Sequence, residues 1–515
     1  MSGPVSWRRV SLLFLLWSGL TILPYVQAAT LPPKGRWFTG FFHYQDDLYQ
    51  DLSFVEQACR GQLLFQNKFD VRPQEGFLVN LEWAGAGLLA RALGLGPIGG
   101  FHALGFVAAF VFTAAAARIL FLGGCRSVGW GLAVVLAGGG LGWVALTAGA
   151  RQWSLPDLAT TLFPWNQRLA GGPHALLGSG LFLWALAGLV EWRAGASRRR
   201  FLIPAALLGL IRPFDLGIFG VTAAVVLLLE SRRAANPWRS WSSGVLDLVW
   251  LVPVLFYDVL AFALHPSFSV WSGGQNTIAW SGLGPLALAL GPAAALGIAG
   301  WRRAAPSELA ASLRQALTAA ALCMAALSTS ASFGFQFLNS LGAVVLLLGA
   351  LGLRGRLLPV AALALCPSSL VLLWQAWNPS PQLFAPRDYR ESTQVLERRC
   401  RPGDILVAPI DLSLLVAGLT PCHVALGHWV LTPDRETRGR ESERFYDAVT
   451  PPAWRVAYLE TIGAAFVALP AGKGHWLGDA SAFGPLLGTP LLELWARNAQ
   501  ADRRGVRKAE TKATP

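Results

Sequence analysis

The sequence predicts an all-α polytopic membrane bundle with a small external α/β domain at its C-terminal end. Of the 515 residues, 54% are hydrophobic and only 14% are charged, with a mean hydropathy of +0.46. Apolar runs of about 20 residues, each long enough to cross the hydrocarbon core of a bilayer, recur from Val10 to Trp377. A soluble chain of this length carries far more charge, so a soluble fold is excluded. We expect roughly 10 to 12 spans.

The net charge of +13 does not indicate a nucleic-acid-binding protein. The sequence contains neither an RNA-binding aromatic motif nor a soluble basic domain. The basic residues instead gather in short loops between apolar runs, which is typical of the cytoplasmic side of a membrane protein. These loops contain Arg8–Arg9, Arg193, Arg198–Arg200, Arg232–Arg233, Arg302–Arg303, Arg354 and Arg356.

Residues 1–29 form a short basic start followed by an apolar run, Val10–Ala29. Val26-Gln27-Ala28 resembles a signal-peptidase site, so cleavage is one interpretation. We favour an uncleaved transmembrane anchor, because the acidic segment that follows can contribute to a functional site only if it is held beside the bundle. With either interpretation, residues 30–75 form the first external loop, and the N-terminus of an uncleaved chain is cytoplasmic.

The bundle is expected over residues 76–377, and the basic loops set its orientation. Leu357–Trp377 follows Arg354 and Arg356, so it runs outward and everything after it is external. The same alternation assigns the preceding apolar runs: Val245–Leu264 and Leu313–Ser328 run outward, and Thr277–Gly300 and Asn339–Leu353 run inward.

One apolar segment, Phe201–Glu230, has basic residues on both sides, so both of its ends are expected in the cytoplasm. Arg212-Pro213-Phe214-Asp215 interrupts it. Proline disrupts a helix, and a broken helix at membrane depth is tolerated only beside protein or water. We therefore predict two short helices whose turn faces an external cavity.

Three apolar runs between residues 76 and 150 do not fit the alternation, because the loops on either side are both expected outside. Either Gly76–Leu95 is non-spanning or re-entrant, as Arg118 and Arg126 favour, or Gly138-Gly139-Gly140 breaks the third run. The sequence leaves both possibilities open.

Residues 378–500 are more polar and predict the small external α/β domain. Asp404–Pro409 and Ala464–Pro470 are expected strands, and Tyr389–Arg399 and Glu441–Ala448 are expected helices. The charged residues 501–515 predict a disordered tail.

Of the six cysteines, Cys400 and Cys422 lie in this polar part and can pair if it is outside. No cysteine pair has the spacing of a zinc site. His423 and His428 are five residues apart, which suits no simple metal-binding face of a helix, so we expect structural roles for both.

Two adjacent acids, Asp46 and Asp47, follow the first apolar segment. Adjacent carboxylates repel, so one pKa rises unless a cation neutralises the pair. One carboxylate can accept the proton of a sugar hydroxyl, and a pair can bind Mg²⁺ or Mn²⁺ through oxygen ligands. A solvated acid pair in a loop is the alternative. Asp51 is expected to be an ordinary surface acid.

Other polar residues also stand where external segments meet the bundle. Asp157 follows Pro156 and is either a contributor to the site or a helix N-cap. His174 starts a span and suits an interfacial hydrogen bond. A charge at membrane depth costs about 2.5–3.5 kcal/mol, so Arg212 and Asp215 need a stabilising role there. They form either a local ion pair or helix cap, or an anion site for a lipid phosphate.

The order of these features resembles the GT-C class of polyprenol-dependent glycosyltransferases. That class includes protein O-mannosyltransferases and lipid A aminoarabinose transferases, and the chain is most similar to uncharacterised bacterial membrane proteins of the class. The similarity covers about Phe41–Asp434. It rests on Asp46-Asp47-Leu48-Tyr49, Gly138–Trp143, Pro173-His174, Arg212–Asp215 and Gly427–Thr432.

The resemblance implies a bacterial inner-membrane enzyme that moves a sugar from a polyprenyl-phosphate donor to an external glycan, lipid or protein acceptor, with inversion. It implies that Asp46 is the catalytic base, that Asp47 assists or binds the metal, and that Asp157 contributes a second acid. The substrate-binding residues it implies are Tyr49, His174, Arg212, Asp215 and Gln336.

The chain departs from the class at one position. Relatives often carry a basic residue in the loop matching Phe333–Asn339, where this chain has Gln336. Arg212 is therefore the main candidate for the lipid phosphate. The alternative function is a non-enzymatic transporter or membrane scaffold, which the interrupted helix favours and the lack of a visible inverted repeat disfavours.

Overall fold

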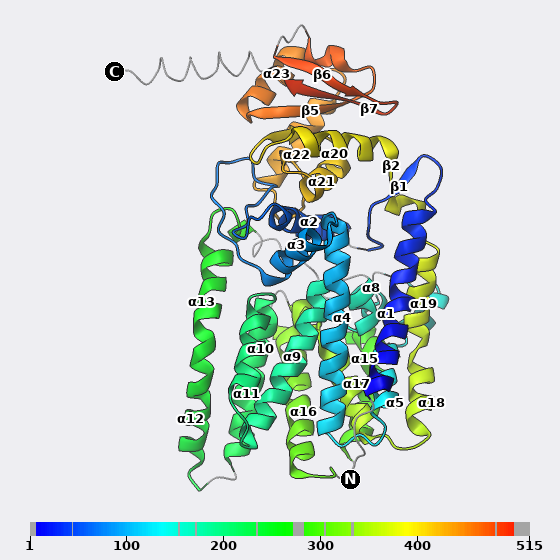
Figure 1. Ribbon diagram of the computed structural model, residues 1–515, viewed down its shortest axis with the longest axis vertical. Helices are drawn as coiled ribbons and strands as arrows, with labels where there is room; N and C mark the ends of the chain where they lie inside the picture. The colour runs from blue at the N-terminus through cyan, green and yellow to red at the C-terminus, as the bar shows by residue number, and fades with distance from the viewer. Residues whose placement is uncertain are drawn as a thin grey trace.

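A helical bundle and an α/β domain stacked on one of its ends make up the protein (Figure 1). The computed structural model describes residues 7–43, 45–152, 155–169, 172–232, 235–270, 283–302, 305–330, 334–478 and 482–498. The predicted tail and the first residues of the predicted span Thr277–Gly300 lie outside these ranges. The predicted fold class, a polytopic all-α bundle with a C-terminal α/β domain, is confirmed.

The described residues contain eight helices long and apolar enough to cross a membrane, or nine if the bent pair α18 and α19 counts as one span. This is fewer than the expected 10 to 12, because α10 has only 11 residues and α17 only 12. The helices of the bundle are α1 (Trp7–Thr30), α4 (Pro97–Leu122), α5 (Val128–Ala137), α6 (Gly142–Thr147), α9 (Gly172–Arg193), α10 (Arg199–Gly209), α11 (Pro213–Ser231), α12 (Pro237–Leu248), α13 (Val252–Val259), α15 (Leu283–Trp301), α16 (Glu308–Ser330), α17 (Leu341–Gly352), α18 (Leu357–Leu365) and α19 (Pro367–Trp377).

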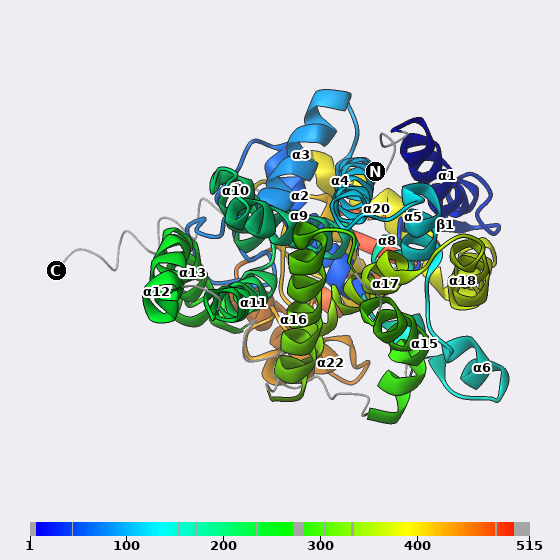
Figure 2. The ribbon, with the colours of Figure 1, turned by 90° about the horizontal axis from the view of Figure 1, so that it is seen from below.

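Seen from below, α12 and α13 lie at one edge of the bundle, and α1 and α18 lie at the opposite edge (Figure 2). Large apolar side chains on α12 and α13, such as Trp238, Leu246 and Phe256, are exposed. An exposed apolar helix surface of this kind is suited to contact with lipid.

Several helices have basic residues at one terminus, and these termini lie together on the side of the bundle remote from the α/β domain (Figure 1). Arg193 Nε lies 2.9 Å from Glu230 Oε2, and Arg198 Nη1 lies 2.8 Å from Asp247 Oδ1. These ion pairs join α9 to α11 and the start of α10 to α12. The predicted clustering of basic loops at one side is thus a feature of the fold, while its assignment to the cytoplasm stays a prediction.

The predicted break at Arg212 is present, because α10 ends at Gly209 and α11 begins at Pro213. α11 is longer than expected, since its 19 residues qualify as a span. Both possibilities for residues 76–150 occur: α3 (Leu81–Leu93) has only 13 residues, and a glycine-containing segment separates α5 from α6.

The acidic segment predicted to be a loop is instead a helix, α2 (Gln45–Cys59), lying between the bundle and the α/β domain (Figure 1). Every residue from Leu48 to Ala58 is buried. The segment was assigned to a loop because it lacks the single apolar stripe of a surface helix. α2 needs no such stripe, since it packs against α3, α4 and α21 (Ile410–Leu419) and is buried on nearly all sides. The acids of its first turn also stabilise the positive end of the helix dipole.

The α/β domain contains a five-stranded sheet with the order β4-β3-β5-β7-β6. β3 pairs in parallel with β4 and β5, and β7 pairs antiparallel with β5 and β6. Both predicted strands are confirmed, and the all-apolar β3 is fully buried, as parallel strands usually are. The strands are β3 (Ile405–Val407), β4 (His423–Val424), β5 (Ala464–Pro470), β6 (Phe483–Gly488) and β7 (Leu492–Arg497), and the other helices are α20 (Arg387–Arg399), α22 (Arg435–Tyr446) and α23 (Pro452–Thr461).

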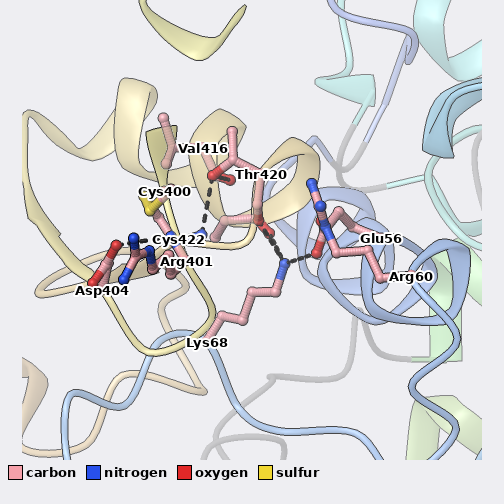
Figure 3. Close-up of a disulfide and its surroundings, with 10 residues drawn as sticks. Glu56, Arg60, Lys68, Cys400, Arg401, Asp404, Val416, Thr420 and Cys422 are labelled. Atoms are coloured by element: carbon pink, nitrogen blue, oxygen red, sulfur yellow. Dashed lines mark hydrogen bonds and ion pairs between the residues drawn. A yellow bond between two sulfur atoms is a disulfide. The ribbon is translucent and has the colours of Figure 1, made fainter. Parts of the chain in front are cut away.

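Two connections hold the α/β domain to the bundle and to α2. β1 (Arg36–Phe38) pairs antiparallel with β2 (Phe384–Pro386), so the segments that follow α1 and α19 are joined. Lys68 Nζ donates to the carbonyl oxygens of Ala417 (3.1 Å) and Thr420 (2.7 Å) and also contacts Glu56 of α2 (Figure 3). The Cys400–Cys422 disulfide, which the sequence allowed, lies beside these contacts.

Candidate functional site

Asp46 and Asp47 occupy the first turn of α2 and line an open pocket of about 580 Å³. The pocket lies where the bundle meets the α/β domain. Its walls come from α2, from the end of α19, from the segment that follows α19, and from Trp429 of the α/β domain. Asp46 lines this pocket, whereas Asp157 and Arg212 are not among its lining residues.

The α/β domain fixes the side chain of Asp47. His428 Nε2 lies 3.0 Å from Asp47 Oδ1, and Trp429 Nε1 donates to the same oxygen at 3.2 Å. His428 Nδ1 accepts hydrogen bonds from the backbone N–H groups of Val430 and Leu431 at 3.2 and 3.1 Å. Because Nδ1 is an acceptor, the ring proton lies on Nε2 and is donated to Asp47.

Asp46 accepts no hydrogen bond from the described residues. Partial burial, reinforced by the negative charge of Asp47, raises the pKa of the Asp46 carboxyl above its usual range. A carboxylate with a raised pKa binds a proton more readily, which is the property that a general base needs. The acid pair therefore separates into one fixed carboxylate and one free carboxylate.

Tyr49 lies one turn further along α2 and is buried. Its hydroxyl donates to the Thr39 carbonyl oxygen at 3.2 Å, and burial raises its pKa. The phenol is therefore already used within the protein and does not line the pocket.

Asp157 holds the glycine-containing break of the bundle together. It lies in the first turn of α7 (Pro156–Ala159) and is 1% exposed. Its Oδ2 accepts from the backbone N–H of Gly142 (2.8 Å) and from Ser368 Oγ on α19 (2.7 Å). A Cβ at position 142 would lie 2.1 Å from Asp157 Oδ1, so the close approach requires glycine. These contacts join α6 and α7 to α19.

Arg212, Asp215 and Gln336 lie together, as the sequence interpretation grouped them. Arg212 Nε lies 3.0 Å from Asp215 Oδ2, and Arg212 Nη2 donates to Gln336 Oε1 at 3.3 Å. Asn339 Nδ2 donates to Asp215 Oδ2 at 3.3 Å. Gly178 of α9 makes room for the pair, because a Cβ there would lie 2.5 Å from Arg212 Cδ.

His174 joins the same cluster of buried polar groups from the start of α9. Its Nδ1 lies 3.5 Å from Asp51 Oδ2 and 3.8 Å from Glu82 Oε1. Asp51, expected at the surface, is therefore buried, because α2 is covered by other elements. Burial raises the pKa of Glu82 to about 8, so this carboxyl is mostly protonated at pH 7. Within this cluster, Arg212 is already paired with Asp215.

A second buried guanidinium, Arg168, was not singled out from the sequence. It belongs to α8 (Pro164–Leu169) and is 6% exposed. Its Nε and Nη2 have no hydrogen-bond partner within the described ranges. It lines a cavity of about 10 Å³, together with Tyr25, His102 and Leu48 of α2. The only available signal was an arginine between two apolar runs.

A resident metal ion is not favoured at Asp46 and Asp47. The part of the chain that is described contains no group of three or more His, Cys, Asp or Glu residues arranged to hold a metal ion. One oxygen of Asp47 is already occupied by His428 and Trp429. The predicted Mg²⁺ or Mn²⁺ therefore finds at most two carboxylate ligands here.

The fold is similar to that of several solved structures. The crystal structure of ArnT from Cupriavidus metallidurans bound to undecaprenyl phosphate matches with a TM-score of 0.54 and 14% identity, covering 96% of this chain and 99% of that one. The apo form of ArnT matches with a TM-score of 0.52, 13% identity, and 96% and 98% coverage. The oligosaccharyltransferase AglB from Archaeoglobus fulgidus reaches a TM-score of 0.47 with 12% identity, and the match covers 96% of this chain and 74% of AglB.

No protein-family model and no curated protein sequence matches this chain. The similarity to ArnT extends over nearly the whole of both chains and shows that the protein has a GT-C-like fold. The resemblance inferred from the sequence is confirmed at the level of the fold.

Proposed function

We propose that this protein is a membrane glycosyltransferase that moves a sugar from a polyprenyl-phosphate donor to an acceptor at the end of the bundle that carries the α/β domain. The observation that carries the proposal is the free carboxylate of Asp46, with its raised pKa, in an open pocket at this junction. The binding of undecaprenyl phosphate by ArnT, which has a similar fold, supports the class of donor.

In the proposed reaction, Asp46 accepts the proton of the acceptor hydroxyl while the oxygen of that hydroxyl attacks the anomeric carbon of the donor sugar. The bond from that carbon to the donor phosphate breaks, and the phosphate leaves with the electron pair, so the configuration at the carbon inverts. Asp47, held by His428 and Trp429, does not take the proton. Its charge keeps the pKa of Asp46 raised.

The donor phosphate needs a cation, and two buried guanidiniums are candidates. Arg212 was expected from the sequence, but Asp215 and Gln336 already engage it. Among the described residues Arg168 has no such partner, and an unpaired buried charge is costly. An anion would relieve that cost, so we prefer Arg168 and keep Arg212 as the alternative. The small cavity beside Arg168 implies that α2 or α8 moves when a phosphate enters.

Mg²⁺ or Mn²⁺ stays a separate prediction for this site. The mechanism above uses only side chains of the chain itself. Adding EDTA and restoring each ion in turn, with release of polyprenyl phosphate as the readout, measures whether a divalent cation is required.

The bacterial inner membrane is the proposed location, with the α/β domain outside. The Cys400–Cys422 disulfide supports this placement, because disulfides persist in oxidising compartments such as the periplasm. Alkylation of intact cells and of spheroplasts, with and without a reductant, tests it.

The test of the reaction uses the purified full-length protein in detergent and a panel of undecaprenyl-phosphate-linked sugars. Release of undecaprenyl phosphate is followed by mass spectrometry. We expect Asp46→Asn to lower the rate by at least about 10²-fold, the size expected for loss of a general base. Asp411→Asn is the matched control, because Asp411 is an exposed acid that acts on Asp46 only through its charge. Full activity of Asp46→Asn would overturn the assignment.

A non-enzymatic transporter is the second candidate, motivated by the break between α10 and α11. The ion pair and hydrogen bonds of Arg212 explain that break without a transported substrate. Movement of a labelled lipid across proteoliposomes, without release of polyprenyl phosphate, would favour the transporter.

A further inference from the structure

We infer that the pocket beside Asp46 binds a hydroxyl-rich sugar that carries no acidic group, and that it selects against sugars bearing a carboxylate. This inference rests on the proposed function and names the class of sugar at the same site. It is based on the kinds of side chain that line the pocket in this protein.

Side-chain amides dominate the polar part of the pocket wall. They come from α2, from the end of α19 and the segment after it, and from the segment before α7; the residues are Gln45, Gln152, Gln375, Asn378 and Gln382. An amide offers both a donor and an acceptor but no net charge. Sugar hydroxyls likewise both donate and accept, so such a wall matches a polyol.

Gln152 and Gln375 donate to each other's side-chain oxygens at 3.1 Å, whereas Gln45 and Asn378 keep an acceptor oxygen available. Gln45 Nε2 donates to Thr39 Oγ1 at 2.9 Å and lies 3.3 Å from the Phe41 carbonyl oxygen. Asn378 Nδ2 donates to the Trp374 carbonyl oxygen at 2.9 Å. These bonds fix the orientation of both amides, and neither side-chain carbonyl oxygen has a partner among the described residues. Hydroxyl groups are suitable donors to them.

Trp429 adds a flat apolar surface to the same wall. Its indole is half-buried, and its N–H is held by Asp47 at 3.2 Å, so the ring has a fixed orientation. An aromatic ring held in this way can pack against the C–H face of a sugar ring, which buries apolar area without a charge.

The charges around the pocket disfavour an acidic ligand. Its described lining includes the two acids Asp46 and Asp47 and no lysine or arginine. His43 also lines it, but burial lowers its pKa to about 4, so the imidazole is neutral at pH 7. Two further charged groups, Asp411 and Arg435, act on Asp46 from beyond the lining with opposite signs.

An acidic sugar would therefore bring a carboxylate close to two others without a lining cation to pair with it. Like charges placed together in a binding site raise the free energy of the wrong complex, which is a common source of specificity. A neutral sugar of the same shape meets the amides and the indole without this repulsion.

The experiment is saturation-transfer-difference NMR on the full-length protein in detergent, which detects weak sugar binding without turnover. The probes are matched pairs, a methyl hexopyranoside and its methyl hexuronide, in the gluco, galacto and manno series. For at least one series we expect the neutral member to bind about tenfold more tightly, which corresponds to about 1.4 kcal/mol. Equal or tighter binding of every hexuronide, or no binding of any neutral member, would overturn the inference.

Variants show whether this pocket is the source of the selectivity. Asp46→Asn combined with Asp47→Asn removes both charges, and we expect the preference to shrink to about twofold. Trp429→Ala should abolish the signal, whereas Trp454→Ala removes an indole elsewhere in the α/β domain and should not. Because Trp429→Ala can disturb Asp47, Asn378→Ala provides a second, milder lining variant that should weaken neutral-sugar binding several-fold.

The outcome is separable from that of the proposed reaction. If Asp46→Asn keeps full transfer activity while the charge selectivity is as expected, the base assignment fails and the pocket inference stands. If transfer needs Asp46 but hexuronides bind as well as neutral sugars, the pocket inference alone fails. An unchanged preference in the doubly substituted protein also contradicts the inference, because the acid pair is then not its cause.

Discussion

His428 of the α/β domain donates from Nε2 to Asp47 Oδ1 of α2 at 3.0 Å, across 381 positions of sequence. His428 is itself 1% exposed and is held by two backbone N–H groups. A rigid donor therefore sets the position of one member of the acid pair. The α/β domain thereby helps to build the pocket and does not merely cover the bundle.

This contact predicts that His428 acts through Asp47. We expect His428→Ala to lower kcat about tenfold, which corresponds to about 1.4 kcal/mol of transition-state stabilisation. In an Asp47→Asn background the same change should have little further effect, because residues that act through one contact are not additive. His428→Gln retains a side-chain donor and should recover part of the rate. Additive losses in the double variant would contradict the coupling.

The pH dependence of transfer follows from Asp46. A general base must be deprotonated, so kcat/KM should fall as the pH drops below the pKa of Asp46, which lies above its usual range. The charge of Asp47 contributes to that raised pKa, so Asp47→Asn should move the acid limb of the profile to lower pH. Asp411→Asn should move it in the same direction by less. An unmoved acid limb in Asp47→Asn would count against Asp46 as the base.

Arg168 and Arg212 are distinguished by comparing stability with activity. Arg168→Gln removes a buried charge that has no partner in the described part of the chain, so without donor lipid the protein should be as stable as the wild type or more stable. If Arg168 binds the donor phosphate, kcat/KM should nevertheless fall at least about tenfold, a loss of about 1.4 kcal/mol. Thermal unfolding and release of polyprenyl phosphate measure the two effects.

The matched variant, Arg212→Gln, leaves the Asp215 carboxylate without its cation. It should lower the unfolding temperature, because breaking a buried ion pair from one side is strongly destabilising. If Arg212→Gln loses activity while Arg168→Gln keeps full activity, Arg212 and not Arg168 binds the donor phosphate.

The buried pair Lys68 and Glu56 should hold α2 against the α/β domain (Figure 3). Lys68→Met leaves Glu56 with Arg60 as its one remaining partner among the described residues, and it removes the donor to Ala417 and Thr420. Breaking a buried pair from one side costs about 3–5 kcal/mol, so we expect a loss near the lower limit. Adding Glu56→Leu should restore part of it.

Thermal or denaturant unfolding of the purified protein measures the change. Arg60→Gln is the control, because Arg60 is partly exposed and its loss should cost about 1 kcal/mol or less. Equal stability of Lys68→Met and the wild type would show that the pair does not join these elements.

Local patterns in the sequence determined much of the fold. Apolar length identified the bundle, although several apolar runs form helices shorter than expected. Proline after Arg212 marked the break between α10 and α11, and unbroken apolar runs marked β3 and β5. These features depend on neighbouring residues, so a single sequence contains their physical cause. It also placed Asp46 and Asp47 beside the first span.

Only the tertiary structure decided what the acidic and basic side chains touch. The helix α2 is stabilised by burial from several sides, so its residues show no simple period and were assigned to a loop. His428, assigned a structural role from its spacing, reaches Asp47 because the α/β domain folds back onto α2. Asp157 and Arg212 have partners far away in the chain, whereas Arg168 has none among the described residues. A charge's role depends on its partners and its burial, and both arise from contacts between distant segments that a local pattern does not encode.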